Sequence, residues 1–104
     1  MKYLITVSPG SIPIPPKMGA DLLKASKAWI ESKLADGTLD FVYNFFGGGG
    51  VSVGNADSHE RILADMLTYP LYAFFDWDVE PLLEWKSSFD MFTGFYEKMA
   101  SMMD

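Results

Sequence analysis

Carboxylates alternate with apolar side chains in the segment Phe75-Asp-Trp-Asp-Val-Glu80, and this pattern is the clearest chemical signal in the chain. Successive side chains of a β-strand point to opposite faces, so Asp76, Asp78 and Glu80 share one face. A carboxyl group beside apolar surface loses hydration, which raises its pKa and suits it to general acid–base catalysis. Asp76 and Asp78 are therefore candidate catalytic residues, and a solvated strand face is the alternative.

His59 is the single histidine of the chain and a third candidate for proton transfer. An unperturbed imidazole titrates near neutral pH, but His59 lies at the predicted start of a helix, where the helix dipole disfavours the imidazolium. An exposed histidine without a catalytic role is the more frequent outcome at such a position. Because the chain has one histidine and no cysteine, we expect no transition-metal site, and no motif indicates a cofactor.

Four further residues are predicted to bind a substrate on the face that carries the acids. They are Asn44, Phe46, Ser52 and Phe74. Asn44 can polarise a carbonyl or enolate oxygen from a neighbouring strand, although a cross-strand hydrogen bond is the commoner use of such an amide. Phe46 and Phe74 supply the apolar surface that would desolvate the carboxylates.

The composition is that of a folded, acidic protein. The chain has 104 residues, of which 49% are hydrophobic and 15% aromatic, so we expect one globular domain over residues 1–104. Its net charge of −6 argues against nucleic acid or an anionic membrane as a partner, because both bind basic surfaces. No apolar run is as long as a membrane span and no signal-peptide pattern is visible, so the expected location is the cytoplasm.

Hydrophobic periodicity and turn residues predict the elements that position these side chains. Strands are expected over residues 2–8, 39–46, 51–55 and 73–80, and helices over residues 17–36, 58–68 and 87–103. A Pro-rich loop at residues 9–16 follows the first strand, and the four glycines at residues 47–50 read as a hairpin turn. The order βαββαβ predicts an α+β, ferredoxin-like fold with an antiparallel sheet and an additional C-terminal helix.

Alternation along the strands sorts their residues onto two faces. The apolar set is expected to pack under the helices: Tyr3, Ile5, Val7, Leu39, Phe41, Tyr43, Phe45, Val51, Val53, Phe75, Trp77 and Val79. The opposite face is mixed: Leu4, Thr6, Ser8, Asp40, Val42, Asn44, Phe46, Ser52, Gly54, Phe74, Asp76, Asp78 and Glu80. A mixed face of this kind fits a partly covered cleft or a subunit interface, so we expect at least a homodimer.

Residues 41–82 resemble the muconolactone isomerase family. The similarity lies in a glycine-containing hairpin, a small polar cap before a helix, the helix end at Pro70-Leu71, and the strand with Asp76, Asp78 and Glu80. The resemblance implies a ferredoxin-like subunit that pairs into a dimeric α+β barrel and moves protons to isomerise a small lactone. The four consecutive glycines, the Pro-rich loop and the aromatic C-terminal segment depart from the family pattern.

Two functions are consistent with the sequence. The first is a small-molecule enzyme that isomerises a small lactone or enolisable acid by proton transfer, with Asp76 or Asp78 as the base. The second is a non-catalytic dimeric barrel that binds a small apolar ligand or serves as an assembly module. Burial of the two aspartates in a cavity would favour the enzyme.

Overall fold

The computed structural model describes residues 1–103. The elements are β1 (Lys2–Pro9), α1 (Pro16–Ala35), β2 (Leu39–Asn44), β3 (Gly50–Asn55), α2 (His59–Leu67), the 3₁₀ turn η1 (Tyr72–Phe74), β4 (Phe75–Leu82) and α3 (Trp85–Met103). Every strand and α-helix boundary lies within two residues of the prediction from the sequence. Residues 73 and 74, which were expected to begin the last strand, lie in or beside η1 instead.

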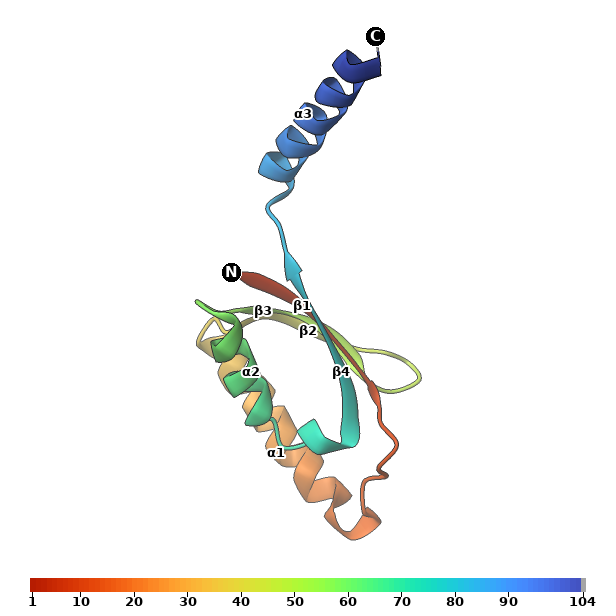
Figure 1. The fold of residues 1–104 in the computed structure, drawn as a ribbon. Helices are drawn as coiled ribbons and strands as arrows, with labels where there is room; N and C mark the ends of the chain where they lie inside the picture. Colours follow the sequence, from red (N-terminus) through yellow and green to blue (C-terminus); the bar gives the residue numbers. More distant parts are fainter. Residues whose placement is uncertain (104) are drawn as a thin grey trace.

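The strands form one antiparallel sheet in the order β2-β3-β1-β4. Helices α1 and α2 cover the same face of this sheet, and the other face carries no helix (Figure 1). This is the ferredoxin-like α+β arrangement that the element order predicts. We call the two sides of the sheet the helix side and the open face.

The predicted turn and helix cap are both present. β2 and β3 are joined through the glycine segment, where Gly48 and Gly49 have φ angles of +105° and +79°. A Cβ on Gly49 would lie 2.0 Å from the Val7 carbonyl oxygen, so this position of the turn accepts only glycine. Ser58 caps α2, because its hydroxyl accepts a hydrogen bond of 3.1 Å from the backbone N–H of Arg61.

The core lies between the sheet and the two helices. Its buried apolar residues are Tyr3, Ile5, Leu39, Ile62 and Met66. Val7, Trp77 and Val79 are half-buried and pack against this cluster from the same side of β1 and β4. The predicted helix-side positions of β1 and β4 are therefore confirmed.

The predicted faces of β2 and β3 are wrong. In the observed register Ser52 lies opposite Ile5 and Val42 opposite Ser52, so both share the helix side. The residues that were expected on the mixed face but lie on the helix side are Val42, Asn44, Ser52 and Gly54. Those that were expected under the helices but lie on the open face are Phe41, Tyr43, Val51 and Val53.

Two local features account for this reversal. A β-bulge between Leu39 and Phe41 makes Asp40 an extra residue, so the alternation of β2 shifts by one after Leu39. On β3, a Cβ at Gly54 would lie 2.9 Å from Cδ1 of Ile62 and 3.1 Å from Cδ1 of Ile5. Close packing of these two isoleucines accounts for glycine at position 54 on the helix side, and the valines of β3 then lie on the open face.

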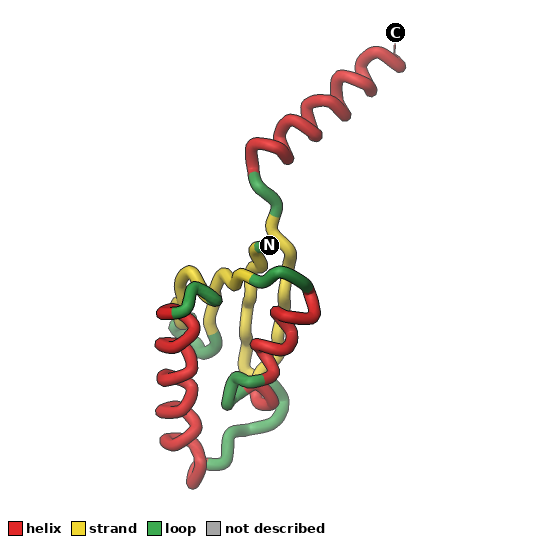
Figure 2. The backbone as a smooth tube through the Cα atoms, turned by 90° about the vertical axis from the view of Figure 1, so that its left-hand side faces the viewer, coloured by secondary structure: helices red, strands yellow, loops and turns green. Residues whose placement is uncertain are grey.

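Helix α3 extends away from the rest of the molecule (Figure 1), and Figure 2 shows the same separation from a second direction. The radius of gyration is 18.4 Å, against about 13 Å for a compact chain of this length. Large apolar side chains are exposed along α3, namely Trp85, Phe89, Met91, Phe92, Phe95, Tyr96, Met99, Met102 and Met103. Such a helix needs a partner surface to be stable in water.

Candidate functional site

A cavity of about 660 Å³ lies on the helix side, between the sheet and helices α1 and α2. Its floor is the middle of the sheet, where Gly50 and Ser52 of β3 carry little or no side chain. Ile5, Val7 and Val42 flank these positions on the neighbouring strands. The cavity therefore follows from the placement of small residues at alternate positions of one central strand.

The walls of the cavity are mainly apolar and partly aromatic. Trp29 of α1, Tyr69 after α2 and Trp77 of β4 contribute aromatic rings, and the rings of Trp29 and Trp77 both pack edge-on against Tyr69. Exposed lining residues come from α1, at Lys27 and Glu31, and from the β2–β3 hairpin. The cavity therefore opens to solvent between α1 and this hairpin.

Tyr69 and Ser26 place two hydroxyl groups at the cavity wall. Burial raises the pKa of the Tyr69 phenol, and it outweighs the nearby Ser26 hydroxyl, which lowers that pKa. Ser26 is only 3% exposed, and its hydroxyl makes no hydrogen bond of good geometry to any described residue. Tyr69 thus stays protonated at neutral pH and can donate a hydrogen bond to a bound molecule.

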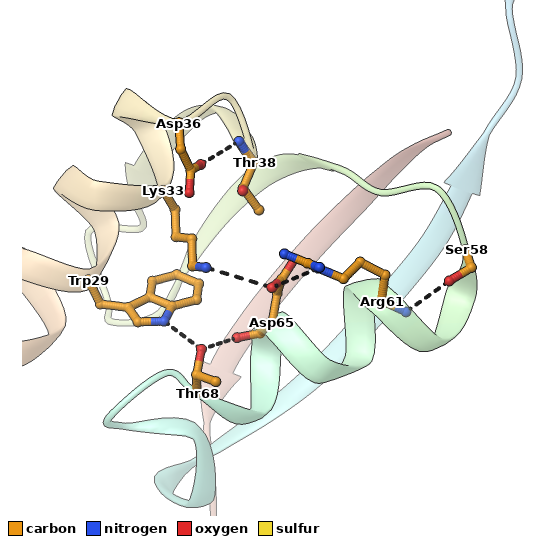
Figure 3. Close-up of polar contacts among 8 residues, drawn as sticks. All are labelled: Trp29, Lys33, Asp36, Thr38, Ser58, Arg61, Asp65 and Thr68. Atoms are coloured by element: carbon orange, nitrogen blue, oxygen red, sulfur yellow. Dashed lines mark hydrogen bonds and ion pairs between the residues drawn. The ribbon is translucent and has the colours of Figure 1, made fainter.

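Asp65 is the buried carboxylate of the cavity wall, with 8% of its surface exposed. Its oxygens lie 3.6 Å from Nζ of Lys33 and 3.3 Å from Nε of Arg61, so an acid of α2 pairs with a base from each helix (Figure 3). The backbone carbonyl of Asp65 also accepts a hydrogen bond of 2.6 Å from the Thr68 hydroxyl. That hydroxyl in turn accepts one of 2.8 Å from the Trp29 indole.

This network fixes the position of α1 relative to α2. Lys33 and Trp29 come from α1, whereas Asp65 and Thr68 come from α2 and its C-terminal end. If either Asp65 or Lys33 loses its charge, the other is left as an unpaired charge at a poorly hydrated position. The network therefore sets the distance between the two helices that form the roof of the cavity.

The structure brings together some of the residues that the sequence predicted for substrate binding. Asn44, Phe46 and Ser52 all line the cavity, although on the helix side and not on the predicted mixed face. Phe74 does not line it, because it lies in η1 before β4 begins.

The three predicted catalytic residues lie away from the cavity. Asp76 and Asp78 are exposed on the open face of β4, opposite Ser8 and Thr6 of β1. The Nδ1 atom of His59 lies 2.6 Å from the Tyr3 hydroxyl, at the beginning of α2. A catalytic role of the two aspartates in this arrangement requires a second molecule over the open face.

Sequence reasoning missed Ser26, Asp65 and Tyr69 as residues of the site. Asp65 had a signal, since it is an acid among the inward-facing positions of an amphipathic helix. Tyr69 lies four residues further on, at the end of that helix, and therefore points to the same side. Ser26 has no comparable signal, because serine is common on exposed helix faces.

Residues 1–103 contain neither a metal-binding cluster nor a membrane-spanning helix. Among these residues, no three histidine, aspartate or glutamate side chains come close enough to hold a metal ion. In the same part of the chain, no helix combines the length and apolar character that a membrane span requires.

Comparison with known proteins defines the fold class. The sequence matches no protein-family model and no curated protein. The solved structures that the chain resembles share its α+β sheet architecture and include muconolactone isomerase, with a TM-score of 0.72 and 19% identity over 81% of this chain and 90% of that chain. At this identity the likeness establishes the fold.

A second similar structure is the 5-chloro-2-hydroxyhydroquinone dehydrochlorinase of Burkholderia phenoliruptrix AC1100, in complex with 2,5-dihydroxybenzoquinone. Its TM-score is 0.62, with 17% identity over 81% of this chain and 95% of that chain. The fold that the sequence predicts is thus found in both an isomerase and a dehydrochlorinase.

Proposed function

We propose that this protein is a homodimeric enzyme that isomerises a small molecule by proton transfer in the helix-side cavity. The cavity itself carries the proposal, because it is large, mainly apolar and lined by a few polar groups, as ligand sites usually are. The likeness of the fold to an isomerase and a dehydrochlorinase supports an enzyme.

Tyr69 is the proposed hydrogen-bond donor to the substrate oxygen, and it keeps its proton while the base takes a proton from one carbon of the substrate and returns it to another. Its phenol stays neutral because burial raises its pKa, and a neutral phenol beside a substrate oxygen can stabilise the negative charge of an enolate. The same cavity wall holds Asp65, whose carboxylate is the proposed proton acceptor. Asp76 and Asp78 are the alternative acceptors, and they would act on a molecule held between two open faces.

Turnover of a panel of small lactones, phenols and enolisable ketones tests these roles. Replacement of Tyr69 by Phe should lower turnover by about 100-fold, the usual scale for a lost catalytic group, and so should Asp65→Asn under conditions where circular dichroism shows that the variant is folded. Asp76→Asn and Asp78→Asn are the matched controls and should keep near-full activity. If instead the open-face variants lose activity and the cavity variants keep it, the site lies between the open faces.

A non-catalytic ligand-binding barrel is the second candidate function. It is favoured by the ion pairs of Asp65, since a carboxylate that already binds Lys33 and Arg61 has a structural role without any reaction. Ligand binding in the cavity without turnover of any compound in the panel would support this alternative.

The proposed dimer forms through the open face and α3. Phe41 and Tyr43 are exposed on the open face next to Val51 and Val53, and no helix among residues 1–103 covers them. The apolar side chains of α3 are exposed in the same way, so both surfaces need a partner of similar character.

Light scattering at micromolar concentration tests this assembly. Wild-type protein should have at least the mass of a dimer, and Phe41→Lys on the open face should reduce it. Leu63→Lys is the matched control, because Leu63 is also exposed but lies on α2, away from the open face and outside the cavity lining. A monomeric wild-type protein would contradict the proposal.

A further inference from the structure

We infer that the cavity binds an uncharged, planar compound of about three fused rings, a substrate class larger and less polar than a small lactone or acid. This inference rests on the proposed function, because it takes the helix-side cavity as the ligand site. It is carried by the volume of the cavity, by the pairing of every charge around it and by the shape of its walls.

The volume sets the size of the ligand. A cavity of about 150 Å³ lined by aliphatic and aromatic side chains is sufficient for benzene. The cavity here has about 660 Å³, which is more than four times as much. Scaled from benzene, this volume holds about four rings, and because the cavity opens on one side we infer about three. A single-ring compound would leave most of the apolar wall uncovered.

The charges exclude an anionic ligand. Asp65 is the charged group in the interior, and Lys33 and Arg61 already pair with it. At the mouth, Lys27 lies 4.0 Å from Glu31 in a solvent-exposed pair, so Glu31 offsets the charge of this lysine and water screens both. The whole chain carries a net charge of −6, which repels anions as they approach. A carboxylate in the cavity would therefore lose its hydration without gaining a cation.

The arrangement of the walls favours a planar ligand. The floor is nearly smooth because Gly50 and Ser52 occupy the helix-side positions of β3. The rings of Trp29, Tyr69 and Trp77 form an aromatic wall against which a flat ring system can pack. The Tyr69 and Ser52 hydroxyls and the Asn44 amide can then hydrogen-bond keto or hydroxyl oxygens on its edge.

Matched pairs of compounds test size and charge separately. The first pair is anthraquinone-2-carboxamide and anthraquinone-2-carboxylate, which have nearly the same shape and differ in charge. The second comparison is the series benzamide, 2-naphthamide and anthraquinone-2-carboxamide, which grows by rings without adding charge. Quenching of Trp29 and Trp77 fluorescence reports binding, in a Trp85→Phe background that removes the tryptophan of α3.

We expect the three-ring amide to bind at least tenfold more tightly than its carboxylate and at least tenfold more tightly than benzamide. Equal or tighter binding of the carboxylate would overturn the inference about charge, and equal binding of benzamide would overturn the inference about size. Both results would leave the cavity as a ligand site and the proposed function intact. If no compound binds, the inference fails, whereas the proposed function is still decided by the separate turnover panel.

Variants inside and outside the cavity locate the bound compound. Ser52→Phe fills the floor of the cavity and should weaken binding of the three-ring amide at least tenfold. Leu63→Phe changes an exposed side chain of α2, away from the open face and outside the cavity lining, and should leave that affinity unchanged. If Ser52→Phe does not fold by circular dichroism, Ile30→Trp fills the cavity from α1 instead. Binding that survives a folded cavity-filling variant places the compound elsewhere, for example on α3, and overturns the inference.

Discussion

The two faces of the sheet differ in the kind of side chain that the central strands present. On the helix side, β3 contributes Gly50, Ser52 and Gly54, and the space above the first two becomes the cavity. On the open face, the same strand contributes Val51 and Val53, which continue an apolar surface toward Phe41. Small residues thus lie where a core is normally filled, and large ones lie where the subunit has no cover.

This difference shows that hydrophobicity alone does not identify the interior face of a sheet. A face that binds a ligand needs empty space above the sheet, which glycine and serine provide. A face that packs against a second subunit needs exposed apolar surface. The charged groups follow the same division. Asp65 on the helix side is buried and paired, whereas Asp76 and Asp78 on the open face are exposed.

Asp65→Asn should give the largest difference between the two sides. It leaves the mostly buried Lys33 without its counterion, so we expect a loss of about 3 kcal/mol in the free energy of unfolding. Asp78→Asn on the open face should change that free energy by less than about 0.5 kcal/mol. Urea unfolding measures both. Equal losses would show that burial and pairing do not separate these two acids.

Gly54→Val tests the close packing on the helix side. A Cβ at this position already lies 2.9 Å from Cδ1 of Ile62 and 3.1 Å from Cδ1 of Ile5, so the larger side chain forces both isoleucines to repack and should cost about 2 kcal/mol. Val53→Ile also enlarges a side chain of β3, but toward the open face, and should cost less than about 0.5 kcal/mol. The same unfolding experiment compares them. A Gly54→Val protein as stable as Val53→Ile would contradict the observed register.

Much of the fold is readable from the sequence because local signals agree with one another. Alternation predicts β1 and β4 correctly, since Tyr3, Ile5, Trp77 and Val79 all pack on the helix side. The four glycines predict the hairpin, and hydrophobic periodicity predicts the start of α2 to within one residue. The predicted assignment of residues to the two faces fails on β2 and β3. The bulge at Asp40 changes the alternation of β2, and no local residue pattern predicts this bulge.

The site is harder to predict from the sequence than the fold, because it depends on distances between elements that are far apart in the chain. Asn44 and Ser52 are predicted as ligand contacts and do line the cavity, but the prediction places them on the wrong face. Asp76 and Asp78 of β4 are predicted as catalytic residues because acids alternate there with apolar residues. Such alternation does not indicate what covers either face of the strand. Asp65 and Tyr69 become candidates only when the position of α2 over the sheet is known.

The pH dependence of stability tests the environment of Tyr69. Burial raises the pKa of this phenol in the folded state, so above the ordinary tyrosine pKa the unfolded chain loses the proton first. The contribution is present at neutral pH and is lost as pH rises through the folded pKa. Wild-type protein should therefore lose more unfolding free energy between pH 8 and pH 11 than Tyr69→Phe does. An unchanged pH slope in the variant would place this phenol in water.

The smallest expected effect concerns Asp40, the extra residue of the bulge that sets the two faces of β2. Its carboxylate accepts hydrogen bonds from Lys2, at 2.6 Å, and from the Asn55 amide, at 2.7 Å. These bonds lower the pKa of Asp40 in the folded state, so its contribution to stability is present above the unfolded pKa and is lost as pH falls through the folded pKa.

Asp40→Asn should therefore lose less stability than wild-type protein on acidification from pH 6 to pH 2.5, with only a slight decrease at pH 7 because this group is exposed. Lys2→Met removes the strongest hydrogen-bond partner of the Asp40 carboxylate. If the two side chains act together, the double variant of Asp40→Asn and Lys2→Met should be no less stable than the less stable of the two single variants. Additive losses would mean that the two side chains act independently.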